Sequence, residues 1–463
     1  MLALALSRRT DRTARKRFPL LPLALALGIV LLQFGLQRHA SAQSLLELYQ
    51  AARGYDATYL SAKAQAESVA YAAAQAEASR LPSVAMTGNS SRAKVDYPGM
   101  VPGTNASTSD LTILGKQPLF NRSTKFAVEQ ARKSVDVARY DLAAAEQDLI
   151  VRVAQAYFDV LAAQDTLSTA GANKAAISEQ LASAKRNFEV GTATITDTRE
   201  AQARYDLAVA QELIAENDLR TKRIFLDQLV GKPNTAPKPL IAPVELPAMP
   251  PIAVDDWVTR ADEQHPAVLR ARLGYETARL ETEKARAGHL PTLDAVGTLK
   301  TSHGLSNTSS GLLPTVGYGN TNTASIGLQL NVPLFSGFAV QNRVKETLLL
   351  EEKARNDLES ALRQVATATR QTYYGVLSGQ AQVKALEAAE SSSQLALDAT
   401  KLGYKVGVRV NLDVLNAQTQ LYTAQRDLAK ARYDVLVNEL KLRQASGQLN
   451  PGDVSNMNDL FVK

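Results

Sequence analysis

The sequence predicts a mainly α-helical fold with a small membrane-spanning β part, in which one long structural unit occurs twice. Three observations predict this fold class. Short motifs recur at a constant spacing, two stretches of roughly 70 residues keep a helical pattern, and a few short segments alternate between apolar and polar side chains. Together they predict long coiled-coil helices combined with β-hairpins, duplicated within one chain.

The duplication is visible in motifs that lie 216 residues apart. Residues 157–161 (YFDVL) recur as residues 373–377 (YYGVL), and residues 190–191 (VG) recur as residues 406–407 (VG). A long unit that occurs twice is the signature of a repeated architecture. The pattern therefore favours an elongated object built from two similar halves over a compact enzyme.

The N-terminal segment has the composition of a secretory signal peptide. A basic stretch ends at Arg17, an apolar run covers residues 18–36, and residues 40–42 (ASA) fit the small-residue rule for cleavage. We therefore expect residues 1–42 to be removed and Gln43 to become the N-terminus. The alternative is an uncleaved membrane anchor, since the apolar run is nearly long enough to span a bilayer.

Charge and cysteine content exclude several classes of function. The chain carries 52 basic and 46 acidic residues, of which residues 1–42 hold seven basic and one acidic. The remainder has 45 of each and a formal net charge of zero, so nucleic acid is not an expected partner. Because the chain has no cysteine, disulfides, cysteine-ligated metals and a lipid-modified N-terminus are excluded.

Each copy reads as a helix, a β-hairpin, a long helix, a short break and another helix. The first copy covers residues 43–231, with its hairpin at about 82–120, and the second covers residues 255–447, with its hairpin at about 290–335. Helices are predicted at about 44–80, 121–190, 197–231, 255–288, 337–406 and 412–447.

A linker and a tail complete the chain. Residues 232–254 are rich in proline, so no helix is expected to cross them, and residues 448–463 are expected to form a C-terminal tail. At 1.5 Å per residue, a helix of about 70 residues is roughly 100 Å long. Helices of this length without membrane character need partner helices along their whole length.

The last helix of the second copy shows the seam for such a partner. Large apolar residues recur there every seven positions: Val414, Leu421, Leu428, Val435 and Leu442. Alanines follow three positions later, at Ala417, Ala424 and Ala431, and the first copy repeats this column with Ala201, Ala208 and Ala215. Large residues beside alanine in heptads favour a closely packed coiled coil. An ordinary amphipathic bundle explains the heptads but not the helix lengths.

Four short segments carry strand signals. Residues 323–332 alternate without exception, with apolar side chains at even positions, and residues 83–89, 111–117 and 292–300 echo this pattern. Runs of about ten residues cross a bilayer when tilted, so we expect the even-numbered face of residues 324–332 to contact lipid. The alternative is a small soluble sheet packed on the helices, but a lone hairpin in each copy is marginally stable.

Closure of such a sheet requires more than one chain. Four strands cannot form a closed membrane barrel, and open strand edges are not tolerated in lipid. Two chains give eight strands and three give twelve, both even numbers that occur in barrels. A bore that passes large cargo favours three.

The sequence contains no pattern typical of catalysis. The four histidines, His39, His265, His289 and His303, lie without metal-ligand spacing. The motifs of zinc proteases, serine hydrolases and phosphate-binding loops are absent from the sequence. We therefore expect no catalytic residue, no metal, no cofactor and no enzymatic activity.

The breaks between the paired helices, at residues 190–197 and 404–413, are unusually polar. Glycine permits the chain reversal, and Thr196 with Asp197, like Asn411 with Asp413, provides candidate helix N-caps. Capping does not explain Tyr404 and Arg409, which stand at the second break.

The chain resembles the TolC family of trimeric outer-membrane channel-tunnels. The most specific likeness lies in residues 403–409 (GYKVGVR) followed by residues 412–418 (LDVLNAQ). Residues 45–53 (LLELYQAAR) and 289–294 (HLPTLD) add to it, and the likeness covers essentially all of the chain after residue 42. Within the family it is nearer to the TolC branch than to the lipidated multidrug-exit branch.

The resemblance implies a homotrimer, with a twelve-stranded barrel in the lipid of the cell outer membrane and a helical tunnel that projects into the periplasm. It also implies docking on a periplasmic adaptor (membrane fusion protein) and an inner-membrane ABC transporter or other pump. The duct would pass proteins, as in type I secretion, or small toxic molecules, and would not hydrolyse ATP. One alternative is a duct that serves multidrug efflux only. A trimeric surface coiled coil of the adhesin kind is another.

The resemblance also implies two functional sites. Family members close the periplasmic end with hydrogen bonds and ion pairs between neighbouring coils. The matching gate residues of this chain are Thr196, Asp197, Tyr404, Arg409 and Arg432.

Family members further carry two acidic rings at the pore constriction. Asp413 supplies one ring, but Asn416 stands at the second position. This departure leaves three acidic side chains in a trimer, so we expect weaker binding of cations at the pore mouth.

Overall fold

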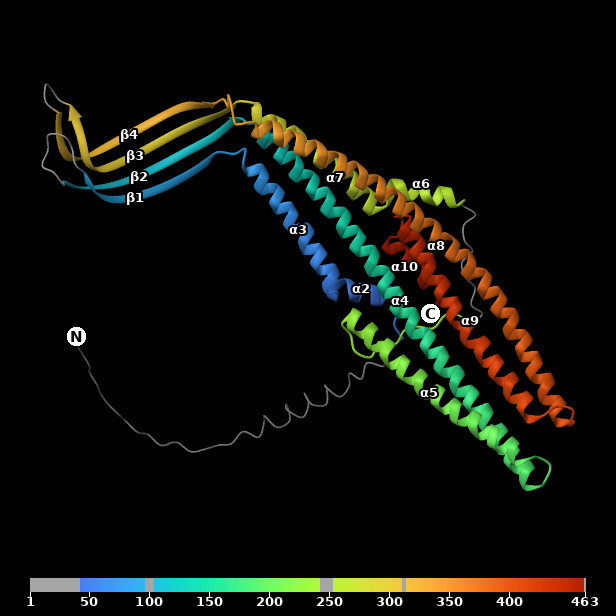
Figure 1. The fold of residues 1–463 in the computed structure, drawn as a ribbon. Helices are drawn as coiled ribbons and strands as arrows, with labels where there is room; N and C mark the ends of the chain where they lie inside the picture. Colours follow the sequence, from blue (N-terminus) through green and yellow to red (C-terminus); the bar gives the residue numbers. More distant parts are fainter. Residues whose placement is uncertain (1–41, 96–103, 242–252, 310–313, 462–463) are drawn as a thin grey trace, which may run out of the picture. The chain divides into compact units, whose positions relative to one another are not determined.

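The computed structural model describes residues 42–95, 104–241, 253–309 and 314–461. The predicted signal peptide lies outside the described residues apart from Ala42. Two long helices dominate each half: α4 (Arg122–Glu189) and α5 (Ile195–Val230) in the first, α8 (Ala339–Lys405) and α9 (Asn411–Ala445) in the second. Figure 1 shows each pair as neighbouring antiparallel rods joined by a short turn. The predicted mainly α fold with internal duplication is confirmed.

The predicted helix at 44–80 is wrong in one respect, because it breaks into α2 (Leu45–Tyr55) and α3 (Ala57–Ala78). Asp56 leaves helical geometry, and its carboxylate accepts a hydrogen bond from the Tyr59 N–H at 2.8 Å. The same carboxylate forms an ion pair with Arg152 of α4, with 3.0 Å between Nη1 and Oδ2. The N-cap thus starts a new helix and fixes it to α4.

The predicted helix at 255–288 also breaks, into α6 (Val254–Gln264) and α7 (Pro266–Arg286), followed by a 3₁₀ turn at Ala287–His289. The break falls at His265 because the residue before a proline is disfavoured in helical geometry. Pro266 then stands at the first position of α7, where its missing N–H costs nothing.

The heptad prediction is confirmed in both coils. The five large heptad residues of α9 are all buried. They pack against a matching column of α8, in which Val383 contacts the Leu428 and Val435 layer and Leu397 contacts the Val414 and Leu421 layer. In the first half the alanine column of α5 packs against α4 at Ala170, Ile177, Leu181 and Ala184. Small residues therefore let the two helices of each coil approach closely.

Four antiparallel strands form one sheet: β1 (Ser83–Val95), β2 (Thr104–Phe120), β3 (Thr292–Ser309) and β4 (Pro314–Asn331), in the order β1-β2-β3-β4. The hairpins of the two copies join through β2 and β3, which the sequence alone did not indicate. The strands have 13 to 18 residues, so the predicted strand lengths of about ten were too short. Backbone pairing continues into the polar Ser, Thr and Asn segments because it does not depend on the apolar pattern.

The two faces of the sheet differ in character. On one face Lys116 pairs with Asp294 at 2.9 Å and Lys300 with Asp110 at 3.5 Å. On the opposite face the side chains of β4 are apolar and exposed, with Leu328 at 70%. Among the described residues, no helix combines the length and the hydropathy needed to cross a bilayer.

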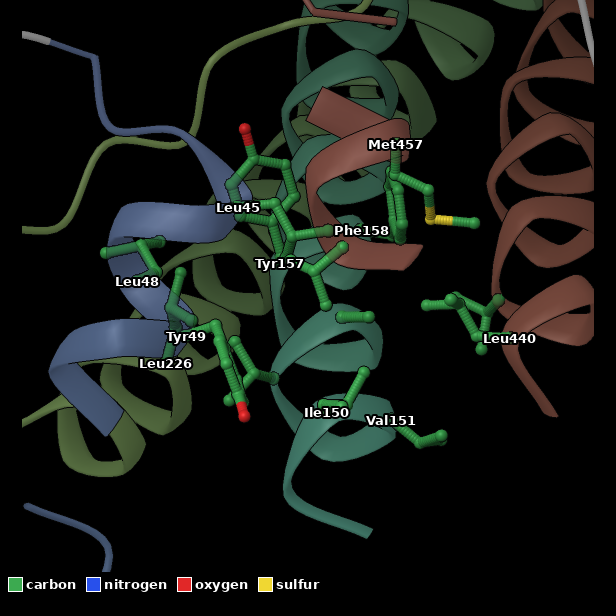
Figure 2. Close-up of a cluster of buried hydrophobic side chains, with 14 of the residues drawn as sticks. Leu45, Leu48, Tyr49, Ile150, Val151, Tyr157, Phe158, Leu226, Leu440 and Met457 are labelled. Carbon is green, nitrogen blue, oxygen red and sulfur yellow. The ribbon is translucent and has the colours of Figure 1, made fainter. Parts of the chain in front are cut away.

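The largest hydrophobic core lies where α2, α4, α5 and α9 meet (Figure 2). Tyr157 and Phe158 of α4 are fully buried there, and Phe461 packs on both rings, with centroids 5.1 and 6.0 Å away. The predicted C-terminal tail is thus not simply a tail. It contains α10 (Pro451–Asn458) and ends in the core, because its apolar side chains fill the junction between the two halves.

Candidate functional site at the two helix turns

The two helix turns have nearly the same backbone. Gly191 and Gly407 both have φ of 78°, in the left-handed region that favours glycine. After each glycine, two successive N–H groups donate to a single carbonyl of the preceding helix, that of Asn187 in the first turn and that of Gly403 in the second. The repeated sequence therefore produces a repeated reversal that ends α4 and α8 and starts α5 and α9.

The predicted N-caps lay one to three positions too late, since the N-cap residue is Thr194 in α5 and Val410 in α9. Thr194 caps α5, since its Oγ1 accepts from the Asp197 N–H at 3.2 Å, and Asp197 in return accepts from the Thr194 N–H at 2.9 Å. Asp413 has the equivalent position in α9 and accepts from the Val410 N–H at 3.4 Å. Asp197 thus forms a reciprocal capping pair with Thr194, whereas Asp413 only accepts from Val410, because the valine side chain has no acceptor.

Tyr404 holds the two turns together inside one chain. The side-chain amide of Asn187, at the end of α4, donates to the Tyr404 hydroxyl at 3.0 Å. A second contact of the same kind lies deeper, where the Gln180 amide of α4 donates to the Oδ1 atom of Asn411. Asn411 is 3% exposed, so this amide contact is shielded from water. We call these two contacts the amide clasp.

Sequence reasoning missed the amide clasp. Isolated Asn and Gln side chains on a helix form no recognisable motif, and the two sides of each contact lie more than 200 residues apart. In each contact the two partners come from different copies, so only the packing of the copies brings them together.

The structure brings the predicted gate residues together only in part. Arg409 pairs with Asp413 in its own turn, with 3.6 Å between Nη1 and Oδ2. Within the part of the chain that the structure describes, no hydrogen bond or ion pair joins Thr196 or Asp197 to Tyr404 or Arg409. Contacts of this kind between neighbouring chains stay a prediction.

Arg432 lies further along α9 and pairs with Glu387 of α8 at 2.8 Å, inside its own coil. Its Nε atom is buried and has no hydrogen-bond partner among the described residues. The adjacent Tyr433 crosses to the other coil, where its hydroxyl donates to Asp165 of α4 at 2.7 Å. Burial raises the pKa of the Asp165 carboxyl above its ordinary value, although this hydrogen bond acts in the opposite direction.

An arginine side chain of the same chain contacts each of the two predicted constriction residues. Asp413 has Arg409, and the Asn416 carbonyl oxygen accepts from Nη2 of Arg204, which lies on α5, at 2.9 Å. Arg204 was not predicted as a site residue. Its signal in the sequence was only a basic residue about two and a half turns inside α5, which is common on exposed helix faces.

An amphipathic antiparallel sheet joined to two long coiled coils is the architecture of the outer-membrane channel proteins. Solved structures of this class share the fold. The outer membrane protein VceC of Vibrio cholerae superposes with a TM-score of 0.72 at 20% identity, over 87% of this chain and 96% of that one. CusC superposes with a TM-score of 0.74 at 17% identity, over 89% and 96% of the two chains.

The chain belongs to the outer membrane efflux protein family, whose sequence model matches residues 48–232 and 257–448. It is 33% identical over 420 residues to the outer membrane protein TolC of Vibrio cholerae serotype O1, covering 90% of this chain and 93% of the relative. The alkaline protease secretion protein AprF of Pseudomonas aeruginosa is 34% identical, with coverage of 76% and 72%. The protein is therefore an exit duct of the outer membrane.

Proposed function

We propose that three copies of this chain assemble into one duct, in which their sheets close into a twelve-stranded barrel and their coils into a tunnel. The observation that carries the proposal is the character of the outer edges. Strands β1 and β4 are the edges of the sheet. Open edges in lipid leave backbone groups without hydrogen bonds, and pairing β4 of one chain with β1 of the next removes them.

The edges of the helical part support the same arrangement. Within the chain α4 packs against α9, which leaves α5 and α8 at the two sides (Figure 1). On α8 the exposed residues Tyr374, Leu395 and Leu402 share one heptad position, at separations of 21 and 7 residues. On α5, Leu207 and Ile214 are exposed seven residues apart. These exposed apolar residues at heptad spacing, one set on each edge, can pack as knobs into the facing edge of the neighbouring chain.

We further propose protein export by type I secretion as the main task of the duct, with a periplasmic adaptor and an inner-membrane ABC transporter as partners. The names of relatives support this choice. The proteases secretion protein PrtF of Dickeya chrysanthemi is 30% identical and AprF 34%, whereas the probable efflux pump outer membrane protein TtgC of Pseudomonas putida is 25% identical. The chain would act as a passive duct and not as an enzyme.

Two experiments test the proposal. Purified protein in planar bilayers should give discrete single-channel steps, and chemical cross-linking should stop at three chains. A surface coiled coil without a bore gives no steps. In a host whose own duct is deleted, the chain should restore secretion of a protease substrate of an ABC transporter more fully than resistance to small toxic molecules. The reverse ranking would identify a multidrug exit duct.

A further inference from the structure

The charges on one face of the four-stranded sheet are compensated. Lys116 pairs there with Asp294 at 2.9 Å. Lys300 pairs with Asp110 at 3.5 Å, and the Ser302 hydroxyl donates to the same carboxylate at 2.5 Å. These two carboxylates are the only acidic side chains of the described strands, so the basic and acidic charges of this face balance.

The opposite face carries two basic residues without such a partner. Side chains alternate along a strand, so Arg92 and Lys94 of β1 lie on the same face as Met86, whose side chain is 69% exposed. Both basic side chains are exposed, and neither forms an ion pair with a described residue. The sequence places one acid, Asp96, shortly after them, outside the described residues. The basic side chains therefore exceed the acidic ones even when Asp96 is counted.

The apolar band of this face has the height expected of a lipid-facing surface. The strand register connects Leu111 through Thr301 to Asn322, so the band extends from Val332 to the level of Leu111 over about ten residues of a strand. At about 3.3 Å per residue and a tilt of about 40°, such a run spans roughly 25 Å, which is the height of the apolar band in membrane barrels. The boundary of the hydrocarbon therefore falls just beyond Leu111.

A row of polar side chains marks this boundary. The Ser90 and Ser109 hydroxyl oxygens lie 3.2 Å apart, and Nδ1 of His303 lies 2.6 Å from Oδ1 of Asn320. The two basic residues of β1 follow within four positions of Ser90, toward the end of the sheet that is far from the helices. Because long basic side chains can bend back toward an interface, their charged groups reach the level of the lipid headgroups.

We propose that Arg92 and Lys94 bind the phosphate group of an acidic lipid at the external boundary of the membrane. The proposal rests on the barrel proposed above, in which this face contacts lipid. Guanidinium and ammonium groups form strong, charge-assisted hydrogen bonds with phosphate oxygens. A headgroup that has no cation of its own complements the excess of basic charge. Basic residues on an edge strand can also prevent association of sheet edges, and the experiment separates that role from lipid binding.

Native mass spectrometry of the trimer in a neutral detergent tests the inference, with dioleoylphosphatidylglycerol and dioleoylphosphatidylcholine as probes. Both lipids carry a phosphate, but only phosphatidylglycerol has a net negative charge. Wild type should bind it about tenfold more tightly than phosphatidylcholine, at one site per chain. The double variant Arg92→Gln with Lys94→Gln should lose this preference. In wild type the preference should shrink at high salt, since the Debye length falls to about 3 Å at 1 M.

Lys116→Gln is the matched control, because Lys116 is a half-exposed lysine of the neighbouring strand on the opposite face, and it should keep the wild-type preference. Equal binding of the two lipids by wild type, or an unchanged preference in the double variant, would overturn the inference. Aggregation of the double variant, with no lipid preference in wild type, would assign the two charges to protection of the sheet edge and would also overturn it. Absence of trimers and of single-channel steps in wild type would instead refute the proposed function.

Discussion

Asn187 and Gln180 stand in no motif, yet their amides cross between the two halves of the chain at the turns. A neutral hydrogen bond contributes about 0.5–1.5 kcal/mol, and an exposed ion pair such as Arg409–Asp413 about 0–1 kcal/mol. The partly buried amide clasp is therefore at least as strong as the visible ion pair. At the residue scale, the hydrogen bonds of the amide clasp contribute at least as much to closure of the turns inside one chain as the Arg409–Asp413 pair does.

Removal of the amide clasp should loosen the turns. We expect Asn187→Ala and Tyr404→Phe each to raise single-channel conductance, and the double variant to raise it no further, because both changes delete the same hydrogen bond. The increase should be the same at pH 5 and pH 8. Gln155→Ala serves as the control, because Gln155 contacts Lys441 far from the turns. Additive effects of the two changes would show that Tyr404 has another partner in the assembled duct.

Asp165 should give the stability of the helical part a pH dependence. Its pKa is raised in the folded chain by burial, so the unfolded chain releases this proton first as pH rises. Stability should therefore fall as pH rises from the ordinary value of 3.8 through the folded pKa. Asp165→Asn should flatten this part of the curve of melting temperature against pH. Asp398→Asn, on exposed α8, should not, and equal slopes for all three proteins would contradict the assignment.

The C-terminal helix matters at the scale of elements, because it closes the core between the two halves. Phe461 is 2% exposed and contacts both Tyr157 and Phe158. Its backbone also pairs with Leu240 of the linker. One short segment thus ties the linker, α4 and α9 together, which a disordered tail would not do.

Truncation of this side chain should be costly. Phe461→Ala removes a buried aromatic ring, for which losses of about 3–5 kcal/mol are typical. We expect a lower temperature of trimer dissociation and faster proteolysis of the linker and α10. Phe335→Ala is the control, because Phe335 is 76% exposed and should change little. Equal stability of both variants would place Phe461 outside the folding core.

At the scale of the whole molecule, the sheet must present one face to lipid. The strand register puts the apolar residues of β4 on the face opposite the Lys116–Asp294 pair. Exposed fractions of 92% for Ile326 and 70% for Leu328 would be unfavourable in water, and they are expected where lipid covers the surface.

A charge on that face should impair assembly, whereas the same charge on the other face should not. Leu328→Arg should cost about 2–4 kcal/mol if the side chain lies near the bilayer midplane. Gln329→Arg, at the adjacent position, points to the polar face and pairs in register with Asp294. We expect heat-resistant trimers on gel electrophoresis for Gln329→Arg and their loss for Leu328→Arg. Intact Leu328→Arg trimers would exclude this face from the lipid boundary.

The sequence by itself determined the elements of this protein that depend on local periodicity and local backbone chemistry. Heptads predicted the coils, alternation predicted the strands, and the repeated Val-Gly predicted the turns, because each pattern acts over a few residues. The breaks at Asp56 and His265 were not predicted, although they follow from local chemistry, an N-cap in the first case and a following proline in the second. The tertiary structure decided the joining of β2 to β3, the burial of Phe461 and the contacts of Arg204, Asn187 and Gln180. Each of these depends on residues that are distant in sequence and meet only when the two copies pack, so no local pattern records them.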